Sequence, residues 1–96
     1  MKNEIVIKNG ARTRIPHNKH EKECYDIMEK NGYTVIKSGY PDLFCFNESG
    51  DVVLVEVKPN SNHSLKTNQA KILKMLSKYG IPCYKWTPDK GFEKIL

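Results

Sequence analysis

The sequence contains no hydrophobic run long enough to cross a membrane. No apolar stretch approaches ~18 residues, and the opening MKNEIVIKNG lacks the apolar core of a signal peptide. No repeat, linker or low-complexity segment divides the 96 residues. These absences predict a single domain over residues 1–96 that has no membrane partner and stays in the compartment where it is made.

The sequence has three cysteines, and their spacing matches neither a disulfide framework nor a zinc site. Cys24, Cys45 and Cys83 are widely separated and lie among apolar neighbours. No two of them form a C-x-x-C pair, and neither His20 nor His63 stands at the spacing of a zinc ligand. We therefore expect reduced cysteines that are buried or partly buried, with no disulfide and no zinc site.

Carboxylates are fewer than basic side chains. Lys and Arg number 16 against 11 Asp and Glu, for a formal net charge of +5. A basic domain is typical of proteins that bind nucleic acid. Charge alone leaves open a soluble basic domain that has no polyanionic partner.

The order of the predicted elements indicates an α/β domain. Asn9-Gly10 predicts a hairpin of residues 4–8 and 11–15. The other expected elements are a helix over 18–31, strands over 33–37, 43–46 and 52–57, a helix that is capped by Ser64 or Thr67 and runs to 79, a strand over 83–87, and a helical turn or strand over 92–96. This order predicts a mixed sheet flanked by helices, with residues 1–16 as a hairpin arm and 18–90 as the core.

The stretch Gly39–Lys58 carries ionisable residues that a purely structural hairpin does not need. Asp42 opens its first strand, and Glu56 and Lys58 close its second. Side chains alternate along a strand, so Glu56 and Lys58 share one face, and antiparallel pairing would bring Asp42 to the same end. Asp42, Glu56 and the Val57 carbonyl are suitable oxygen ligands for Mg²⁺. Lys58 could then orient an attacking water or stabilise charge on phosphorus, although a salt bridge at a sheet edge would explain the same residues.

Two further polar residues fall on helix faces that otherwise point inward. Glu21 lies on the stripe of Cys24 and Met28. Gln69 lies on the predicted core stripe of the second helix, which is Ile72, Leu73 and Leu76. Both are predicted to point at the sheet. Structural roles remain open, because a Glu near a helix start favours the helix dipole and a Gln can lie at the rim of a core.

Together these residues resemble the PD-(D/E)XK nuclease superfamily and, within it, the compact VRR-NUC group. The resemblance covers about residues 20–90 and rests on three motifs, namely Gly39-Tyr40-Pro41-Asp42-Leu43, Glu56-Val57-Lys58, and Leu65 with Gln69 at a helix start. It implies a restriction-endonuclease-like αβββαβ core, here with an added N-terminal hairpin. It also implies a DNA endonuclease that uses Mg²⁺ or Mn²⁺ and no small-molecule cofactor.

The resemblance assigns a role to each motif residue. Asp42 and Glu56 would bind metal, Lys58 would be the catalytic lysine, and Gln69 would assist it. Glu21 would correspond to the acidic residue of the first helix and supply a further ligand, an assignment that rests on its spacing and helix face alone. Separately from the resemblance, we expect DNA contact by four basic residues, Arg12, Arg14, Lys19 and Lys66, although Arg12 and Arg14 could simply keep an edge strand polar.

Standalone members of the group resemble archaeal Holliday-junction resolvases and tend to form homodimers. We therefore expect a homodimer that cuts branched, flap or four-way junction DNA in the cytoplasm of a bacterium or of a phage-infected host. Two alternatives stay open. One is a DNA-binding module with an inactive nuclease-like site, and the other is a nuclease of different nucleic-acid specificity on the same fold.

Overall fold

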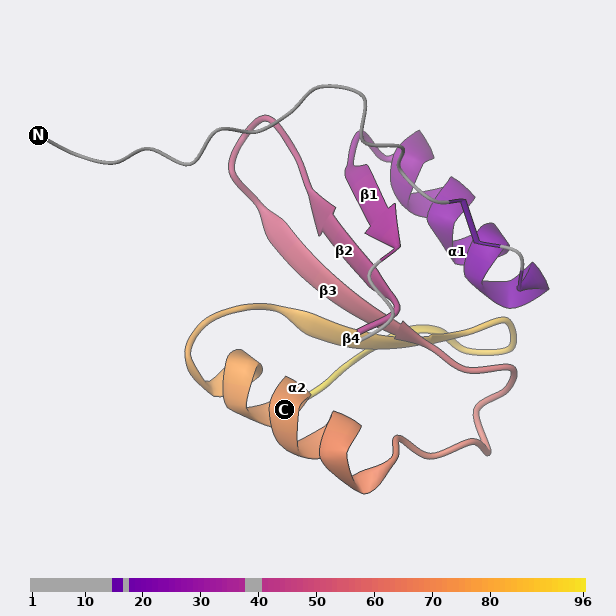
Figure 1. Ribbon diagram of the computed structural model, residues 1–96, viewed down its shortest axis with the longest axis vertical. Helices are drawn as coiled ribbons and strands as arrows, with labels where there is room; N and C mark the ends of the chain where they lie inside the picture. Colours follow the sequence, from indigo (N-terminus) through magenta and orange to yellow (C-terminus); the bar gives the residue numbers. More distant parts are fainter. Residues whose placement is uncertain (1–14, 17, 38–40) are drawn as a thin grey trace, which may run out of the picture.

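A five-stranded mixed sheet carries one helix on each face (Figure 1). The structure is a computed structural model that describes residues 15–16, 18–37 and 41–96. The elements are α1 (Lys19–Lys30), β1 (Thr34–Lys37), β2 (Leu43–Phe46), β3 (Val52–Val57), α2 (Thr67–Lys78), β4 (Cys83–Thr87) and β5 (Gly91–Lys94). The predicted α/β fold is confirmed, whereas the predicted hairpin arm, with Arg12 and Arg14, lies outside the described residues except for Ile15.

The strands follow one another across the sheet in chain order. All neighbours are antiparallel except β3 and β4, which are parallel and joined through α2. A parallel pair needs such a crossover connection, because a tight turn cannot return the chain to the same end of the sheet. At the C-terminus, where a helical turn or a strand was predicted, the chain forms the strand β5.

Both helices end and begin at identifiable signals. Asn18 caps α1 by accepting hydrogen bonds from the backbone N–H groups of residues 20 and 21. Gly32 and Gly80 follow the two helices at φ +90° and +93°, a conformation that glycine adopts without strain. The prediction of Ser64 or Thr67 as the cap of α2 is wrong, since the N-cap is Lys66. Its backbone N–H donates to the side chain of Gln69 at 2.9 Å, which ties down the first turn without a capping hydroxyl.

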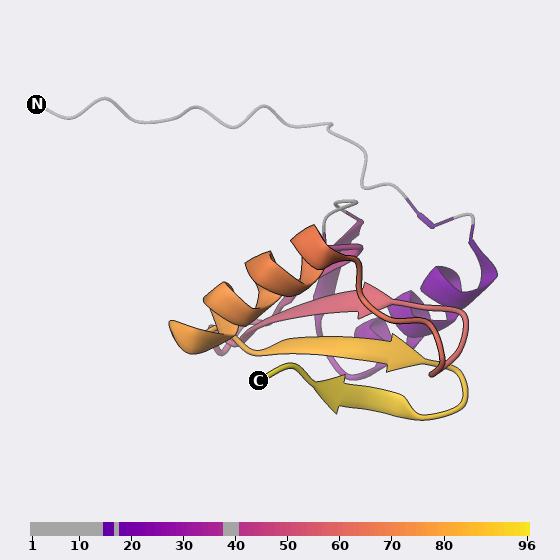
Figure 2. The same ribbon diagram turned by 90° about the horizontal axis from the view of Figure 1, so that it is seen from below.

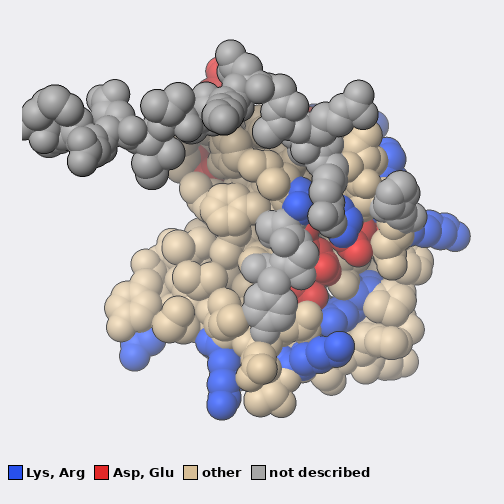
Figure 3. Space-filling model, in the orientation of Figure 1, with Lys and Arg blue, Asp and Glu red and all other residues tan. Residues whose placement is uncertain are grey.

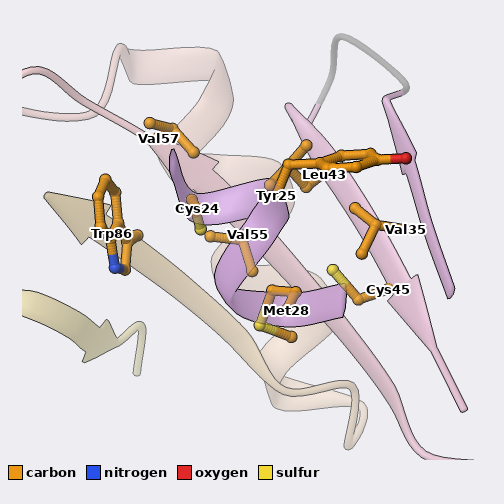
Figure 4. Packing of buried hydrophobic residues seen from close by; sticks show 9 residues of the cluster. All are labelled: Cys24, Tyr25, Met28, Val35, Leu43, Cys45, Val55, Val57 and Trp86. Atoms are coloured by element: carbon orange, nitrogen blue, oxygen red, sulfur yellow. The ribbon is translucent and has the colours of Figure 1, made fainter. Parts of the chain in front are cut away.

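The two faces of β3 separate two hydrophobic clusters, as the alternation predicts. Val55 and Val57 pack with α1, whereas Leu54 packs with Leu73 of α2. The α1 cluster, shown in Figure 4, contains Cys24, Tyr25, Met28, Val35, Leu43, Cys45, Val55, Val57 and Trp86. Figure 2 shows the resulting arrangement, with α1 and α2 on opposite sides of β1 and β2.

The three cysteines are buried and free, as expected from their spacing. Burial raises the pKa of Cys45 to about 12 and also raises the pKa values of Cys24 and Cys83. These thiols are therefore core residues with little thiolate character. Among the described helices, none has the length and hydropathy needed to span a bilayer.

Candidate active site

Four of the predicted site residues meet where β3 ends. The backbone N–H of Asp42 donates to Glu56 Oε1 at 3.3 Å, and Asp42 Oδ2 accepts from the backbone N–H of Val57 at 2.9 Å. Gln69 Nε2 donates to Glu56 Oε2 at 2.8 Å. Lys58 Nζ donates to Gln69 Oε1 at 3.1 Å and lies 3.7 Å from Glu56 Oε2. We call Asp42, Glu56, Lys58 and Gln69 the carboxylate–lysine cluster.

Local strand geometry positions three members of this cluster. β2 and β3 are antiparallel with Leu43 opposite Val55, so Asp42 stands one residue earlier and faces Glu56. Glu56 and Lys58 project from the face opposite the valines that pack with α1. Gln69 reaches the same place from the first turn of α2, which covers that face.

The electrostatics of the cluster favour a bound cation. Glu56 is only 2% exposed. The pKa of Glu56 is raised to about 7, first by burial and then by the nearby Asp42 carboxylate, while the Lys58 ammonium acts to lower it. Two adjacent carboxylates with one ammonium leave excess negative charge in a partly buried place. A cation at that position would remove the repulsion.

The donor atoms suit a hard divalent ion. The backbone N–H of Val57 donates to Asp42. Because the N–H and C=O of one strand residue point to the same side, the carbonyl of Val57 also points toward Asp42. Carboxylate and carbonyl oxygens are the ligands that Mg²⁺ and Mn²⁺ prefer.

Glu21 does not join the cluster in this structure. Its Oε1 lies 3.5 Å from Nζ of Lys37, at the end of β1. The residues described contain no group of three His, Cys, Asp or Glu side chains arranged to hold a metal ion. α1 covers the face of the sheet opposite α2, and its inward stripe packs against β1, β2 and β3 rather than against Gln69.

The two described lysines that were assigned to DNA contact are exposed and lie at helix starts. Lys19 is the first residue of α1, and Lys66 is the N-cap of α2, next to Gln69. Lys66 therefore flanks the carboxylate–lysine cluster, whereas Lys19 stands on the other helix.

The sequence alone did not reveal a second lysine beside Glu56. Lys85 of β4 is paired in register with Glu56, and its Nζ donates to the carbonyl of Ser61 at 3.2 Å. Ser61 also donates from its backbone N–H to Asp89 Oδ1 at 3.0 Å and from its hydroxyl to Asp89 Oδ2. The hydroxyl hydrogen bond lowers the pKa of Asp89. These contacts anchor the loop that links β3 to α2. Only the parallel register of β3 and β4 brings Lys85 there, and residue spacing does not specify that register.

One comparison with known families matches most of the chain. The model of the VRR-NUC domain matches residues 5–86, a range that includes all four members of the carboxylate–lysine cluster. No curated protein matches the chain.

Proposed function

Because the chain belongs to the VRR-NUC family of PD-(D/E)XK-like nucleases, we propose that it hydrolyses phosphodiester bonds in DNA with a bound divalent cation. The observation that carries the proposal is the carboxylate–lysine cluster. In it the buried Glu56 accepts hydrogen bonds from the backbone N–H of Asp42 and from Gln69, and Gln69 accepts one from Lys58.

We assign the ion to Asp42, Glu56 and the Val57 carbonyl. When bound, Mg²⁺ or Mn²⁺ would neutralise charge on the phosphate and make a bound water more acidic. Glu21, whose Oε1 lies 3.5 Å from Lys37 Nζ, is not part of this proposed set.

Lys58 and Gln69 supply the remaining chemistry. Gln69 accepts from Lys58 Nζ and donates to Glu56, so one amide fixes the position of both charged groups. The ammonium is thereby preorganised to orient the attacking water or to stabilise the negative charge that develops on phosphorus. This preorganisation avoids the cost of ordering a flexible lysine in the transition state.

The proposed substrate is branched DNA, in the form of flaps or four-way junctions. A domain of this size offers few phosphate contacts and little surface for reading a long base sequence. Selection by DNA shape is therefore more compatible with the chain than selection by an extended sequence.

We expect the chain to cut labelled flap or four-way junction DNA in Mg²⁺ or Mn²⁺ faster than linear duplex of the same sequence. The measurement is product formation on denaturing gels, with chelator as the control. Cutting in chelator would contradict the metal mechanism, and equal rates on linear duplex would contradict selection by branching. Salt-sensitive binding without any cut product, under either ion, would instead favour the alternative of a DNA-binding module with an idle site.

We also propose that the active form is a homodimer. Large apolar side chains are exposed on the α2 side of the sheet, which suits a contact with a second copy. The exposed strand residues are Ile36, Phe44 and Phe46, and the exposed α2 residues are Ile72, Met75 and Tyr79. Ile72 lines a small cavity with Pro41 and Glu56, so this side of α2 faces β2 and lies beside the cluster. We call these six side chains the apolar surface.

A double substitution on this surface, Met75→Glu with Tyr79→Glu, is expected to weaken dimerisation on the order of 100-fold or more. An unpaired charge buried at an interface costs about 3 kcal/mol or more, and both residues are exposed, at 52% and 76%, so the fold should tolerate them. Sedimentation equilibrium against the 11.1 kDa mass of one chain measures the effect. The exposed loop variant Asn62→Glu is the control and should dimerise like the unmodified chain. A double variant that dimerises equally well, or an unmodified chain that stays monomeric at every concentration, would contradict the proposal.

A further inference from the structure

Positive charge is concentrated in one continuous part of the chain. Residues 57–88 contain no Asp or Glu, and their lysines are Lys58, Lys66, Lys71, Lys74, Lys78 and Lys85. In contrast, α1 carries acidic and basic residues together, including the ion pair of Lys22 with Asp26 at 2.6 Å. The excess basic charge of the protein therefore lies on and around α2.

Three of these lysines occupy one side of α2. Lys71, Lys74 and Lys78 are all exposed and follow one another at helical spacing, while Leu73 points into the core. The apolar residues Ile72, Met75 and Tyr79 lie on the other exposed side of the same helix. The solvent side of α2 is thus divided into a lysine side and an apolar side. In Figure 3, basic side chains (blue) lie along the lower part of the molecule, where α2 is drawn in Figure 1. The main acidic area (red) lies above them, near the centre of the view.

The charges of this lysine side are not compensated by the protein. In the described ranges, none of Lys71, Lys74 and Lys78 has a hydrogen bond or an ion pair through its ammonium group. Like charges three and four residues apart on a helix repel each other and destabilise it. A polyanion laid along the helix would remove this repulsion and release its own counterions.

The N-terminal end of α2 lies beside the carboxylate–lysine cluster, and Lys71, Lys74 and Lys78 follow it along the solvent side of the helix. Lys66 precedes the first turn of α2, its backbone N–H bonds Gln69, and Gln69 in turn bonds Lys58. From Lys66 to Lys78 the helix rises about 18 Å. A duplex carries one phosphate per ~1.7 Å of its axis, so about ten phosphates lie along that length.

We propose that the lysine side of α2 binds the phosphate backbone of a duplex arm that leads away from the bond to be cut. The inference rests on the proposed function for the placement of the scissile bond at the cluster. The binding surface itself follows from charge and geometry alone. Contact with phosphates positions a nucleic acid without reading its sequence, which agrees with selection by shape.

The test compares two triple variants that change net charge equally. One is Lys71→Gln/Lys74→Gln/Lys78→Gln, and the control carries Gln at Lys22, Lys30 and Lys90, which are exposed elsewhere. Binding of a fluorescent linear duplex is measured by anisotropy in chelator, where no cutting interferes, at salt concentrations between 50 and 200 mM. The α2 triple should bind about 100-fold more weakly at 0.1 M salt, and its slope of log K against log salt should be shallower by about 2–3. The control triple should change the slope by less than about one.

A triple Lys→Arg variant at the same α2 positions should bind like the unmodified chain, because it retains the charge. Weak binding by this variant would show that packing rather than charge was disturbed, and would overturn the inference. Equal losses in the α2 triple and the control would also overturn it, because net charge alone would then explain the binding. The outcome is separate from the proposed function, since cleavage in metal is scored on the unmodified chain. An uncut substrate with the expected binding difference would contradict only the nuclease, and a cut substrate without that difference would contradict only the lysine side.

Discussion

Lys58→Ala is expected to lower the rate of metal-dependent DNA cleavage by about 10²–10³-fold, the range found when one preorganised charge-stabilising donor is removed. The Lys58 ammonium is 3.1 Å from Gln69 Oε1 and 3.7 Å from Glu56 Oε2, and its side chain is only 13% exposed. It is therefore held in place before substrate arrives. Its loss should reduce the chemical step much more than the affinity for DNA, because many other lysines contribute to binding.

Single-turnover cleavage of a four-way junction, with DNA binding measured in chelator, separates these two effects. Lys90→Ala is the matched control, since it removes an exposed lysine from the turn before β5 and should cut at the unmodified rate. Circular dichroism establishes that both variants are folded. Full cleavage by a folded, DNA-binding Lys58→Ala chain would rule out the proposed role of this lysine.

Asp42→Asn is expected to abolish the stabilisation of the protein by divalent ions. In the unmodified chain, Mg²⁺ or Mn²⁺ at about 100 times its dissociation constant should add about 2.7 kcal/mol to the free energy of unfolding. For a domain of about 100 residues this corresponds to an increase of about 10–20 °C in the melting midpoint. The Asn side chain can still accept the hydrogen bond from Val57, but it brings no negative charge to Glu56.

Without metal, Asp42→Asn should be at least as stable as the unmodified chain. The substitution neutralises the carboxylate of Asp42, which lies next to the carboxylate of Glu56. Because Glu56 is only 2% exposed, the repulsion between the two charges is poorly screened by water. Thermal unfolding with added ion or chelator, together with titration calorimetry, measures both effects without reference to activity. Asp51→Asn, in the turn between β2 and β3, is the control and should keep the full metal-dependent increase. An equal increase in Asp42→Asn, or no increase in the unmodified chain with either ion, would contradict the proposed ligand set.

The carboxylate–lysine cluster shows which parts of a site can be predicted from sequence. The turn over residues 47–51 forms with Gly50 at φ +88°. It returns the chain so that β3 runs antiparallel to β2, as expected. Strand alternation then places Asp42, Glu56 and Lys58 on one face. Gln69 was placed by helical spacing from Leu73, and it bonds both Glu56 and Lys58.

Glu21 and Lys85 show where that reasoning ends. Each of them lies on the inward side of its own helix or strand. Its position in the sequence does not tell which other element that side will meet. Glu21 is on the face that meets β1, where it pairs with Lys37. Lys85 became a neighbour of Glu56 because α2 returns the chain parallel to β3 in one particular register.

By itself the sequence determined the described helices and strands and the meeting of Asp42 with Glu56, because backbone alternation and a short turn depend only on adjacent residues. It did not determine the inward side of α2 in full, since Ile72 was expected in the core and is 37% exposed. The tertiary structure alone decided that α1 and α2 cover opposite faces and that Glu21 pairs with Lys37 of β1. It also decided that α2 carries an apolar side and an uncompensated lysine side into solvent. These features depend on which apolar surfaces bury one another across the whole chain, and such burial joins residues that are far apart in sequence.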